Sequence, residues 1–207
     1  MRRATTPALG SCAPPVALSR LASLARHLRR ALAASLLLPA LALAQSNWSP
    51  SSWFAQGGIA DRTQNATVGL SWDLAPHWEA GSFDLSAYLE ASVSEWHFHP
   101  ASNGHQHSRL AQLGLIPTLR VRPDHGASPW FGEIGIGATF TSTLYRTNDK
   151  SFSTRFNFGD HLALGRNFGA RRQHELALRY EHFSNADIHL PNPGEDFLEL
   201  RYAYRFQ

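Results

Sequence analysis

Cysteine and long apolar stretches are both scarce in this chain of 207 residues. The sequence contains one cysteine, Cys12, and one methionine, Met1. Because no cysteine follows residue 44, neither a disulfide nor a Cys-based metal site can hold the rest of the chain together. The same part of the chain has no apolar run of the roughly 20 residues that a transmembrane helix needs. Its fold must therefore be stable without covalent or metal cross-links, and it does not cross a membrane as helices.

The first 44 residues differ in character from the rest. Six arginines precede an apolar run at residues 31–44, and this run ends in Ala-Leu-Ala. A positive segment, a short apolar segment and a small-residue exit are typical of a secretory signal peptide. A transmembrane anchor is the alternative, but the run is too short to span a bilayer and contains Pro39. We therefore expect residues 1–44 to be a signal peptide and residues 45–207 to be the exported domain.

The charge of the exported domain is not basic. Without the six arginines, 13 Lys and Arg face 16 Asp and Glu, which gives a formal net charge of −3. The high isoelectric point of the whole chain is therefore largely a property of the signal peptide. This charge gives no support to a nucleic-acid partner, and we expect none.

Polar and apolar residues alternate along most of the exported domain, with Gly, Pro, Asn and Asp between the alternating segments. The last segment is the clearest: Leu198, Leu200 and Tyr202 share one face, and Glu199 and Arg201 share the other. A period of two predicts β-strands with two different faces. Eight such strands are expected, near residues 52–59, 66–74, 82–97, 107–122, 129–145, 152–168, 173–184 and 195–207.

This pattern predicts an all-β, eight-stranded antiparallel transmembrane β-barrel with a side-chain-filled interior. Several segments exceed the 9–11 residues that a tilted strand needs to cross a bilayer, and aromatic residues gather near strand ends. An eight-stranded barrel is just wide enough inside for side chains to fill it. A soluble periplasmic lipid-binding barrel is the alternative, and it would turn its apolar face inward. We expect a paired network in the interior, formed by Glu175, Arg179, Glu181, Glu199 and Arg201.

Candidate catalytic residues lie where the last two strands meet. His182 and Ser184 are two residues apart at a strand end, so their side chains share one face. A serine hydroxyl becomes a nucleophile when a base lies beside it and an acid orients that base. The Pro- and Gly-containing turn at residues 190–194 brings two acids, Glu195 and Asp196, back alongside. The pattern therefore indicates a Ser-His-acid esterase site, with Asn185 after the nucleophile as a donor to the oxyanion.

The side on which each acid lies can be predicted from the alternation. Asp196 shares the apolar face of its strand with Leu198, and His182 and Ser184 share the apolar face of theirs, so all three point outward if both apolar faces point to lipid. Glu195 shares the polar face of its strand with the expected interior residues. Asp196 is therefore the expected acid and Glu195 the alternative, because a bulge in the strand would exchange the two. A charged cluster on the lipid-facing wall makes sense if the substrate is itself a membrane lipid.

At these residues the sequence resembles the PagL-type lipid A 3-O-deacylases. Residues 182–186 read His-x-Ser-Asn-Ala, and residues 191–194 read Pro-Asn-x-Gly before an acid. The resemblance is strongest over residues 179–202 and weaker over the rest of the exported domain. It implies an eight-stranded barrel of the Gram-negative outer membrane that hydrolyses the 3-O-linked acyl chain of lipid A. It implies no cofactor, and it identifies His182 as the base, Ser184 as the nucleophile, Asp196 as the acid, Asn185 as the oxyanion donor, and Phe158 and Asp160 as residues that shape the site.

Two positions depart from the family pattern. The acid position holds Asp196 where the family often has Glu, and Asp187 stands where a glycine resembling a second oxyanion donor would be. A carboxylate near a developing oxyanion is unfavourable unless it points away, so Asp187 puts that second donor in doubt.

A second group of residues has a pattern that a metal site could use. His97, His99, His105 and His107 form two His-x-His pairs on the arms of an expected hairpin. A solvated outer loop near lipopolysaccharide phosphates explains them better, because no carboxylate or Cys lies at convincing spacing, and we expect no metal. The function expected from the whole sequence is an outer-membrane serine esterase, a carboxylic ester hydrolase that acts on lipid A of lipopolysaccharide. A non-enzymatic structural barrel and a periplasmic lipid-binding barrel are the alternatives, and homodimer formation is left open.

Overall fold

The computed structural model describes residues 49–101 and 108–206, so the predicted signal peptide lies outside the described residues. The described part forms eight strands and one short 3-10 turn, η2 (Asp124–Gly126). The strands are β1 (Ser52–Ala60), β2 (Thr63–Ala80), β3 (Phe83–Phe98), β4 (Arg109–Arg122), β5 (Trp130–Thr141), β6 (Phe156–Phe168), β7 (His174–Ser184) and β8 (Glu195–Arg205).

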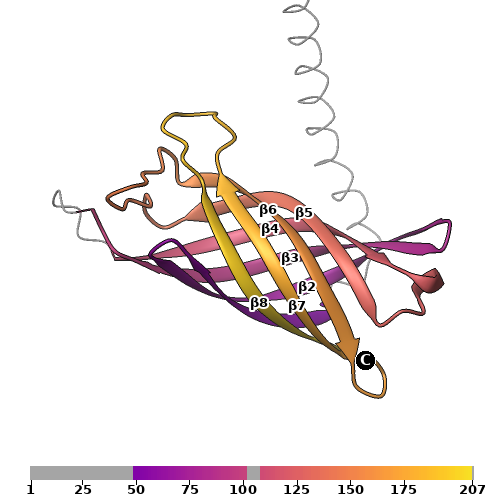
Figure 1. Cartoon of the computed structure of the whole chain (residues 1–207). Helices are drawn as coiled ribbons and strands as arrows, with labels where there is room; N and C mark the ends of the chain where they lie inside the picture. Colours follow the sequence, from indigo (N-terminus) through magenta and orange to yellow (C-terminus); the bar gives the residue numbers. More distant parts are fainter. Residues whose placement is uncertain (1–48, 102–107, 207) are drawn as a thin grey trace, which may run out of the picture. The chain divides into compact units, whose positions relative to one another are not determined.

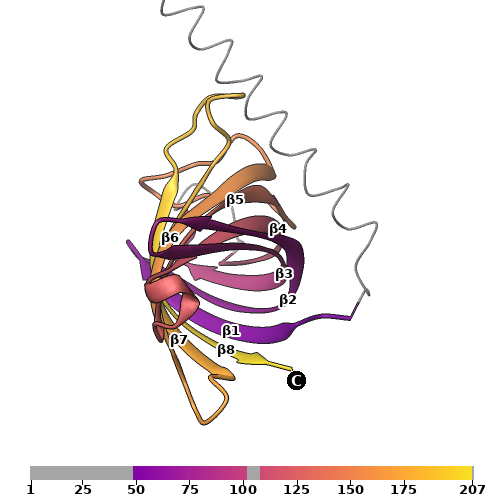
Figure 2. The ribbon, with the colours of Figure 1, turned by 90° about the vertical axis from the view of Figure 1, so that its right-hand side faces the viewer.

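Each strand pairs antiparallel with the next, and β1 pairs with β8 to close the sheet into a barrel. The strands surround one closed interior, as the two views in Figure 1 and Figure 2 show. The predicted eight-stranded antiparallel barrel is thus confirmed. In the ranges that the structure describes, no helix is long and apolar enough to cross a membrane.

Two differences from the predicted strands have physical reasons. β2 runs to Ala80, beyond the predicted end at residue 74, because the register with β3 shifts between Asp73 and His77. Such an irregularity lets a strand continue past a proline, here Pro76. β5 ends at Thr141 and β6 begins at Phe156, so residues 142–155 form a loop instead of strand ends. We call residues 142–155 the β5–β6 loop.

The two faces of the sheet separate as the alternation predicts. On β7, Leu176, Leu178 and Tyr180 are exposed on the outside, whereas Glu175 and Arg179 are buried inside. A soluble lipid-binding barrel requires the opposite arrangement, so this alternative was wrong. An apolar outer surface with a polar interior is typical of barrels that sit in a bilayer.

Ion pairs fill the middle of the interior. Arg179 donates two hydrogen bonds to Glu90, at 2.9 and 3.0 Å, and Arg201 lies 2.9 Å from the same carboxylate. Arg120 forms a two-bond contact with Glu175 at 2.7 and 2.8 Å. The five predicted interior residues are therefore buried, but Glu175, Arg179 and Arg201 pair with Arg120 and Glu90, which the prediction did not include. Glu181 and Glu199 instead accept hydrogen bonds from Gln56.

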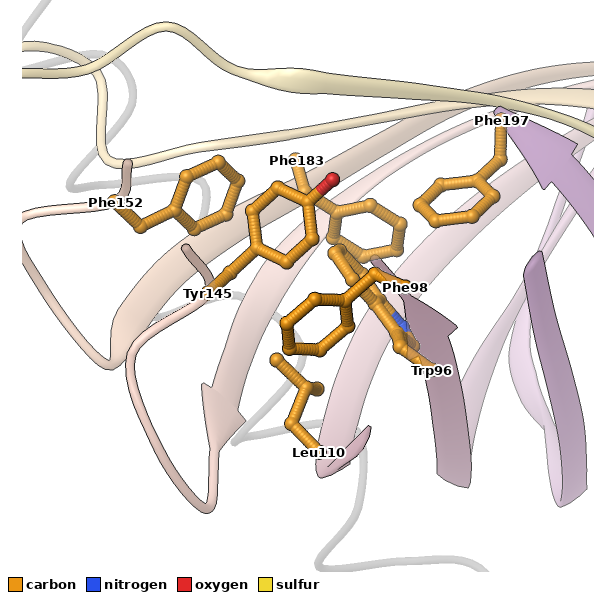
Figure 3. Packing of buried hydrophobic residues seen from close by; sticks show 7 residues of the cluster. All are labelled: Trp96, Phe98, Leu110, Tyr145, Phe152, Phe183 and Phe197. Atoms are coloured by element: carbon orange, nitrogen blue, oxygen red, sulfur yellow. The ribbon is translucent and has the colours of Figure 1, made fainter. Parts of the chain in front are cut away.

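The two ends of the barrel differ. One end carries short turns and the C-terminal end of the described chain, and the other carries the β5–β6 loop and the loop between β7 and β8 (Figure 1). At this second end the interior is apolar: Trp96 stacks edge-on against Phe183 and Phe197, with ring centroids 5.0 and 4.7 Å apart. The full cluster, shown in Figure 3, consists of Trp96, Phe98, Leu110, Tyr145, Phe152, Phe183 and Phe197. Side chains therefore fill both the middle of the barrel and its loop-bearing end.

Candidate active site

Strand register brings three of the predicted site residues into one row across the barrel wall. His182 of β7 lies opposite Asp196 of β8 on one side and opposite Asp160 of β6 on the other. One row further toward the strand end, Ser184 lies opposite Phe158. All five side chains occupy the outward alternation of their strands, so the candidate site is on the outer wall beside the loop between β7 and β8.

His182 and Asp196 form a direct hydrogen bond. His182 Nδ1 lies 2.7 Å from Asp196 Oδ1, and the Tyr180 hydroxyl donates to the same oxygen at 2.7 Å. The side chains of His182 and Asp196 are 33% and 47% exposed. Because a carboxylate only accepts hydrogen bonds, Nδ1 carries the hydrogen, and this leaves Nε2 of the neutral ring free to accept one.

Ser184 shares the outward face of β7 with His182 and is half-buried. No hydrogen bond joins the Ser184 hydroxyl to His182 in the described part of the chain. Residues two apart on a strand are separated by about 6.6 Å along its axis, so the imidazole has to turn toward the hydroxyl to reach it. Contacts of this kind are often long in free enzymes and shorten in the complex with substrate.

Gly194 packs against the imidazole from the other side. A Cβ at this position would lie 2.6 Å from His182 Cε1, closer than side-chain carbons approach one another, and the backbone has a positive φ of 69°. Both the left-handed conformation and the close approach require glycine. Gly194 therefore limits where the His182 ring can lie.

Glu195, the alternative acid, points into the barrel instead. Its side chain is 1% exposed and accepts hydrogen bonds from the Tyr145 hydroxyl at 2.6 Å and Lys150 Nζ at 2.9 Å. Burial and the hydrogen bond to Glu195 raise the pKa of Tyr145 above its ordinary value, so the hydroxyl stays protonated as a donor. Glu195 and His182 thus lie on opposite faces of the sheet.

Asn185 is buried, and its donors are engaged. Its backbone N–H donates to Asn192 Oδ1 at 2.9 Å. Its side-chain Nδ2 donates to Ser153 Oγ at 3.0 Å, Thr154 Oγ1 at 3.1 Å and the His189 carbonyl at 2.8 Å. These hydrogen bonds of Asn185 connect the β5–β6 loop to the loop between β7 and β8, next to Ser184.

The side chain of Asp187 is held by Asn192, the residue that also accepts the hydrogen bond from the Asn185 backbone. Asn192 Nδ2 donates to Asp187 Oδ1 at 3.0 Å, and Asp187 is exposed. The carboxylate that departs from the family pattern is thus turned toward an amide donor.

An apolar hollow lies on the outer wall next to the row of Asp160, His182 and Asp196. Its volume is about 570 Å³, and Gly132 of β5 lines it without contributing a side chain. Leu162 and Tyr180 lie one row below Asp160 and His182 and line its near end. Its lining includes Val121, Gly132, Ile134, Leu162, Leu164, Leu178, Tyr180 and Leu198.

The histidine-rich segment does not form a metal site in the described residues. His97 Nε2 pairs with Glu95 at 2.9 Å, and His99 Nδ1 lies 3.4 Å from the Arg62 carbonyl. His105 and His107 lie outside the described residues. Among the residues that the structure describes, no group of three or more His, Cys, Asp or Glu side chains could hold a metal ion.

Comparison with known proteins identifies the family. The family model described as lipid A 3-O-deacylase (PagL) matches residues 65–205. The chain belongs to the lipid A 3-O-deacylase (PagL) family. A lipid A deacylase PagL from Bordetella bronchiseptica is 37% identical over 161 residues, which cover 72% of this chain and 80% of that protein. One from Pseudomonas aeruginosa is 27% identical over 150 residues, covering 72% of this chain and 82% of that protein.

A solved structure shares the fold of this PagL-family chain. The crystal structure of the outer membrane enzyme PagL superposes with a TM-score of 0.63 and 22% identity, covering 75% of this chain and 99% of that one. This chain therefore has the same β-barrel fold as that outer membrane enzyme.

The sequence did not point to every residue that surrounds the candidate site. Tyr180 continues the apolar face of β7, so nothing marked its hydroxyl as a partner of Asp196. Tyr145 was predicted as a strand end and Lys150 as part of the following loop, and their contacts with Glu195 span 50 and 45 residues of sequence. The loop motif did include Gly194, but only the structure gives its contact with His182.

Proposed function

We propose that this protein is an outer-membrane serine esterase that hydrolyses the 3-O-linked acyl chain of lipid A. The observation that carries the proposal is the hydrogen-bonded His182–Asp196 pair beside Ser184 on the lipid-facing wall. Charged groups on such a wall are costly, and a membrane lipid as substrate explains why they are there. The names of the family and of the curated relatives support the same substrate.

In the first step Ser184 attacks the ester carbonyl of the acyl chain. Asp196 holds His182 by Nδ1, so Nε2 is available to take the proton from the Ser184 hydroxyl as its oxygen bonds to the carbonyl carbon. The carbonyl oxygen becomes an oxyanion in the tetrahedral intermediate. The carboxylate of Asp196 stabilises the imidazolium that forms.

In the following steps the acyl chain passes from sugar to serine and then to water. The bond between the carbonyl carbon and the 3-oxygen of the sugar breaks, and His182 returns its proton to that oxygen. A water molecule then attacks the acyl-Ser184 ester while His182 takes its proton, and the serine is restored as the fatty acid leaves. Every proton moves through His182, so no cofactor is needed, and an ester with its alcohol leaving group suits this pair better than an amide.

The oxyanion requires donors, and the backbone N–H of Asn185 is the proposed one. In the free protein this N–H donates to Asn192 Oδ1. An anionic oxygen is a stronger acceptor than a neutral amide, so the oxyanion can replace Asn192 as its partner. Asp187 does not oppose this while Asn192 holds its carboxylate.

Phe158 and Asp160 are proposed to shape the substrate site. Phe158 lies opposite Ser184 and Asp160 opposite His182, on the side of the row away from Asp196. The apolar hollow below this row, about 570 Å³ in volume, is suited to an acyl chain that runs along the wall.

A purified-enzyme assay tests the proposal. The wild-type barrel and the variants Ser184→Ala and His182→Asn are folded in detergent, mixed with lipopolysaccharide, and the lipid A is analysed by mass spectrometry. We expect wild type to release one ester-linked acyl chain from the 3-position and both variants to release none. Release from another position, or release by Ser184→Ala, contradicts the proposal.

A further inference from the structure

The β5–β6 loop is built into the end of the barrel. Tyr145 is fully buried and Phe152 almost fully buried, and both pack edge-on against Trp96 with ring centroids 5.6 and 6.5 Å apart. Backbone hydrogen bonds between Tyr145 and Phe152, at 2.9 Å, and between Thr147 and Lys150, at 2.8 Å, close the loop on itself. These contacts fix the loop in the aromatic cluster of Figure 3.

From this position the loop holds the residue that precedes Asp196. Tyr145 and Lys150 each donate to a different oxygen of the Glu195 carboxylate. Adjacent residues of a strand point to opposite faces, so a rigidly held Glu195 on the inside fixes the backbone from which Asp196 projects outside. The Tyr145 hydroxyl also lies 2.7 Å from Thr63 Oγ1, so a hydrogen bond connects Tyr145 to β2 as well as to Glu195.

The loop also holds the residue that follows Ser184. Ser153 and Thr154 accept hydrogen bonds from Asn185 Nδ2, and Ser153 Oγ donates to the His189 carbonyl at 2.7 Å. The β5–β6 loop is therefore attached on both sides of the loop between β7 and β8, next to the proposed nucleophile and next to the proposed acid. Figure 1 shows the two loops side by side at this end of the barrel.

We propose that Glu195, Tyr145 and Lys150 are positioning residues, which orient Asp196 and through it His182 for catalysis. This inference rests on the proposed function. Glu195 and Tyr145 are buried on the inner side of the wall, so their effect on Asp196 passes through the backbone of β8. A buried carboxylate is stable only with its partners in place, and the loss of one donor shifts the carboxylate and the strand that carries it. Displacements of about 1 Å at a catalytic group can lower a rate by about a hundredfold.

The inference is tested by a double-mutant cycle on the wild-type barrel in detergent. Tyr145→Phe removes one donor while keeping the ring, Glu195→Gln removes the charge, and the double variant combines them. Lys150→Met removes the second donor, and Lys150→Arg restores it. We expect each single variant to lower kcat about tenfold with KM changed by less than about twofold, and the double variant to be no worse than the poorer single variant. Lys150→Arg should recover most of the activity.

Asp149→Asn is the matched control in the same loop. Asp149 pairs with Arg62 at 3.3 Å, and both side chains are exposed. The variant therefore removes an ion pair of the loop that does not involve Glu195. Exposed ion pairs contribute little, so kcat should stay at the wild-type value. Heat-modifiable migration in gels identifies the folded barrel of each variant.

Hydrogen exchange gives a second readout that does not depend on activity. Amides of residues 185–196 should exchange faster in Tyr145→Phe and Glu195→Gln than in wild type or Asp149→Asn. Unchanged exchange with unchanged kcat overturns the inference, and so does a change in KM alone or additive effects in the cycle. If wild type releases no acyl chain, the proposed function fails, and the exchange rates alone decide whether Glu195 holds the β8 strand end.

Discussion

Asp196 and Glu195 are neighbours in sequence whose side chains lie on opposite sides of the barrel wall. The alternation along β8 predicted this division, because its period is two and no bulge follows Gly194. At the same scale, the sequence could not predict that Tyr180 donates to Asp196 or that Gly194 contacts His182. Both contacts depend on the side-chain and loop conformation that the whole strand pair adopts.

The charge of Asp196 should matter more than its size. Asp196→Asn keeps the shape of the side chain, but its amide can donate to Nδ1 and so favour the wrong tautomer of His182. We expect kcat to fall roughly a thousandfold or more while the barrel stays folded. Steady-state kinetics with lipid A in detergent measures the change, with Tyr180→Phe as the companion variant. Wild-type kcat in Asp196→Asn would exclude Asp196 as the acid.

Gly194 should tolerate no side chain. The Cβ of Gly194→Ala would overlap the His182 ring and would also occupy a left-handed backbone conformation. We expect the ring to move away from Asp196 and activity to fall about a hundredfold, because a small displacement of a catalytic group is enough. Activity and heat-modifiable migration are measured together. A folded variant with full activity would show that the contact does not constrain His182.

At the scale of elements, the strands were predictable and their connections were not. The centres of all eight predicted strands lie within the observed strands, and β2 extends furthest beyond its predicted limits. Residues 142–145 and 152–155 were misassigned to strands because Tyr145 and Phe152 continue the alternation of the strands beside them. In the structure these side chains instead fill the aromatic cluster at the barrel end. The alternation of apolar residues in the sequence cannot distinguish a strand residue that points into the barrel from a loop residue whose side chain packs into it.

The apolar hollow between β5 and β8 gives a prediction at this scale. Gly132→Leu adds a side chain where the nearest atom to its Cβ is 3.9 Å away, so the barrel should remain folded while the hollow fills. We expect kcat/KM for long acyl chains to fall about tenfold. Gly57→Leu is the matched control, since its Cβ also has room, with the nearest atom at 3.7 Å, on β1 away from the hollow. Equal effects of both variants would show that the hollow does not hold the acyl chain.

At the scale of the whole molecule, the ion pairs in the middle of the barrel lie apart from the candidate site on its wall. The interior is held by buried ion pairs such as Arg179 with Glu90, whereas the candidate site is outside. The interior residues could be identified from the alternation, but their pairing across distant strands required closure of the barrel. Because side chains fill the barrel, the proposed function requires substrate to reach the candidate site from the membrane and not through the interior.

Breaking an interior pair should therefore destabilise the barrel without changing its chemistry. Arg179→Met leaves Glu90 with Arg201 as its remaining cation, and we expect the free energy of unfolding to fall by about 3 kcal/mol. The urea midpoint of the detergent-folded barrel measures this loss. The kcat of the folded fraction should stay at the wild-type value, and a large fall in kcat would show that these central ion pairs are coupled to the site.

The most direct test of the central claim is mass spectrometry of lipid A from outer membranes that contain either the wild-type protein or Ser184→Ala. We predict that wild type removes one ester-linked hydroxyacyl chain and that the folded Ser184→Ala barrel removes none. Identical lipid A in both membranes, with both barrels folded, would contradict the claim that this protein deacylates lipid A in the membrane through Ser184.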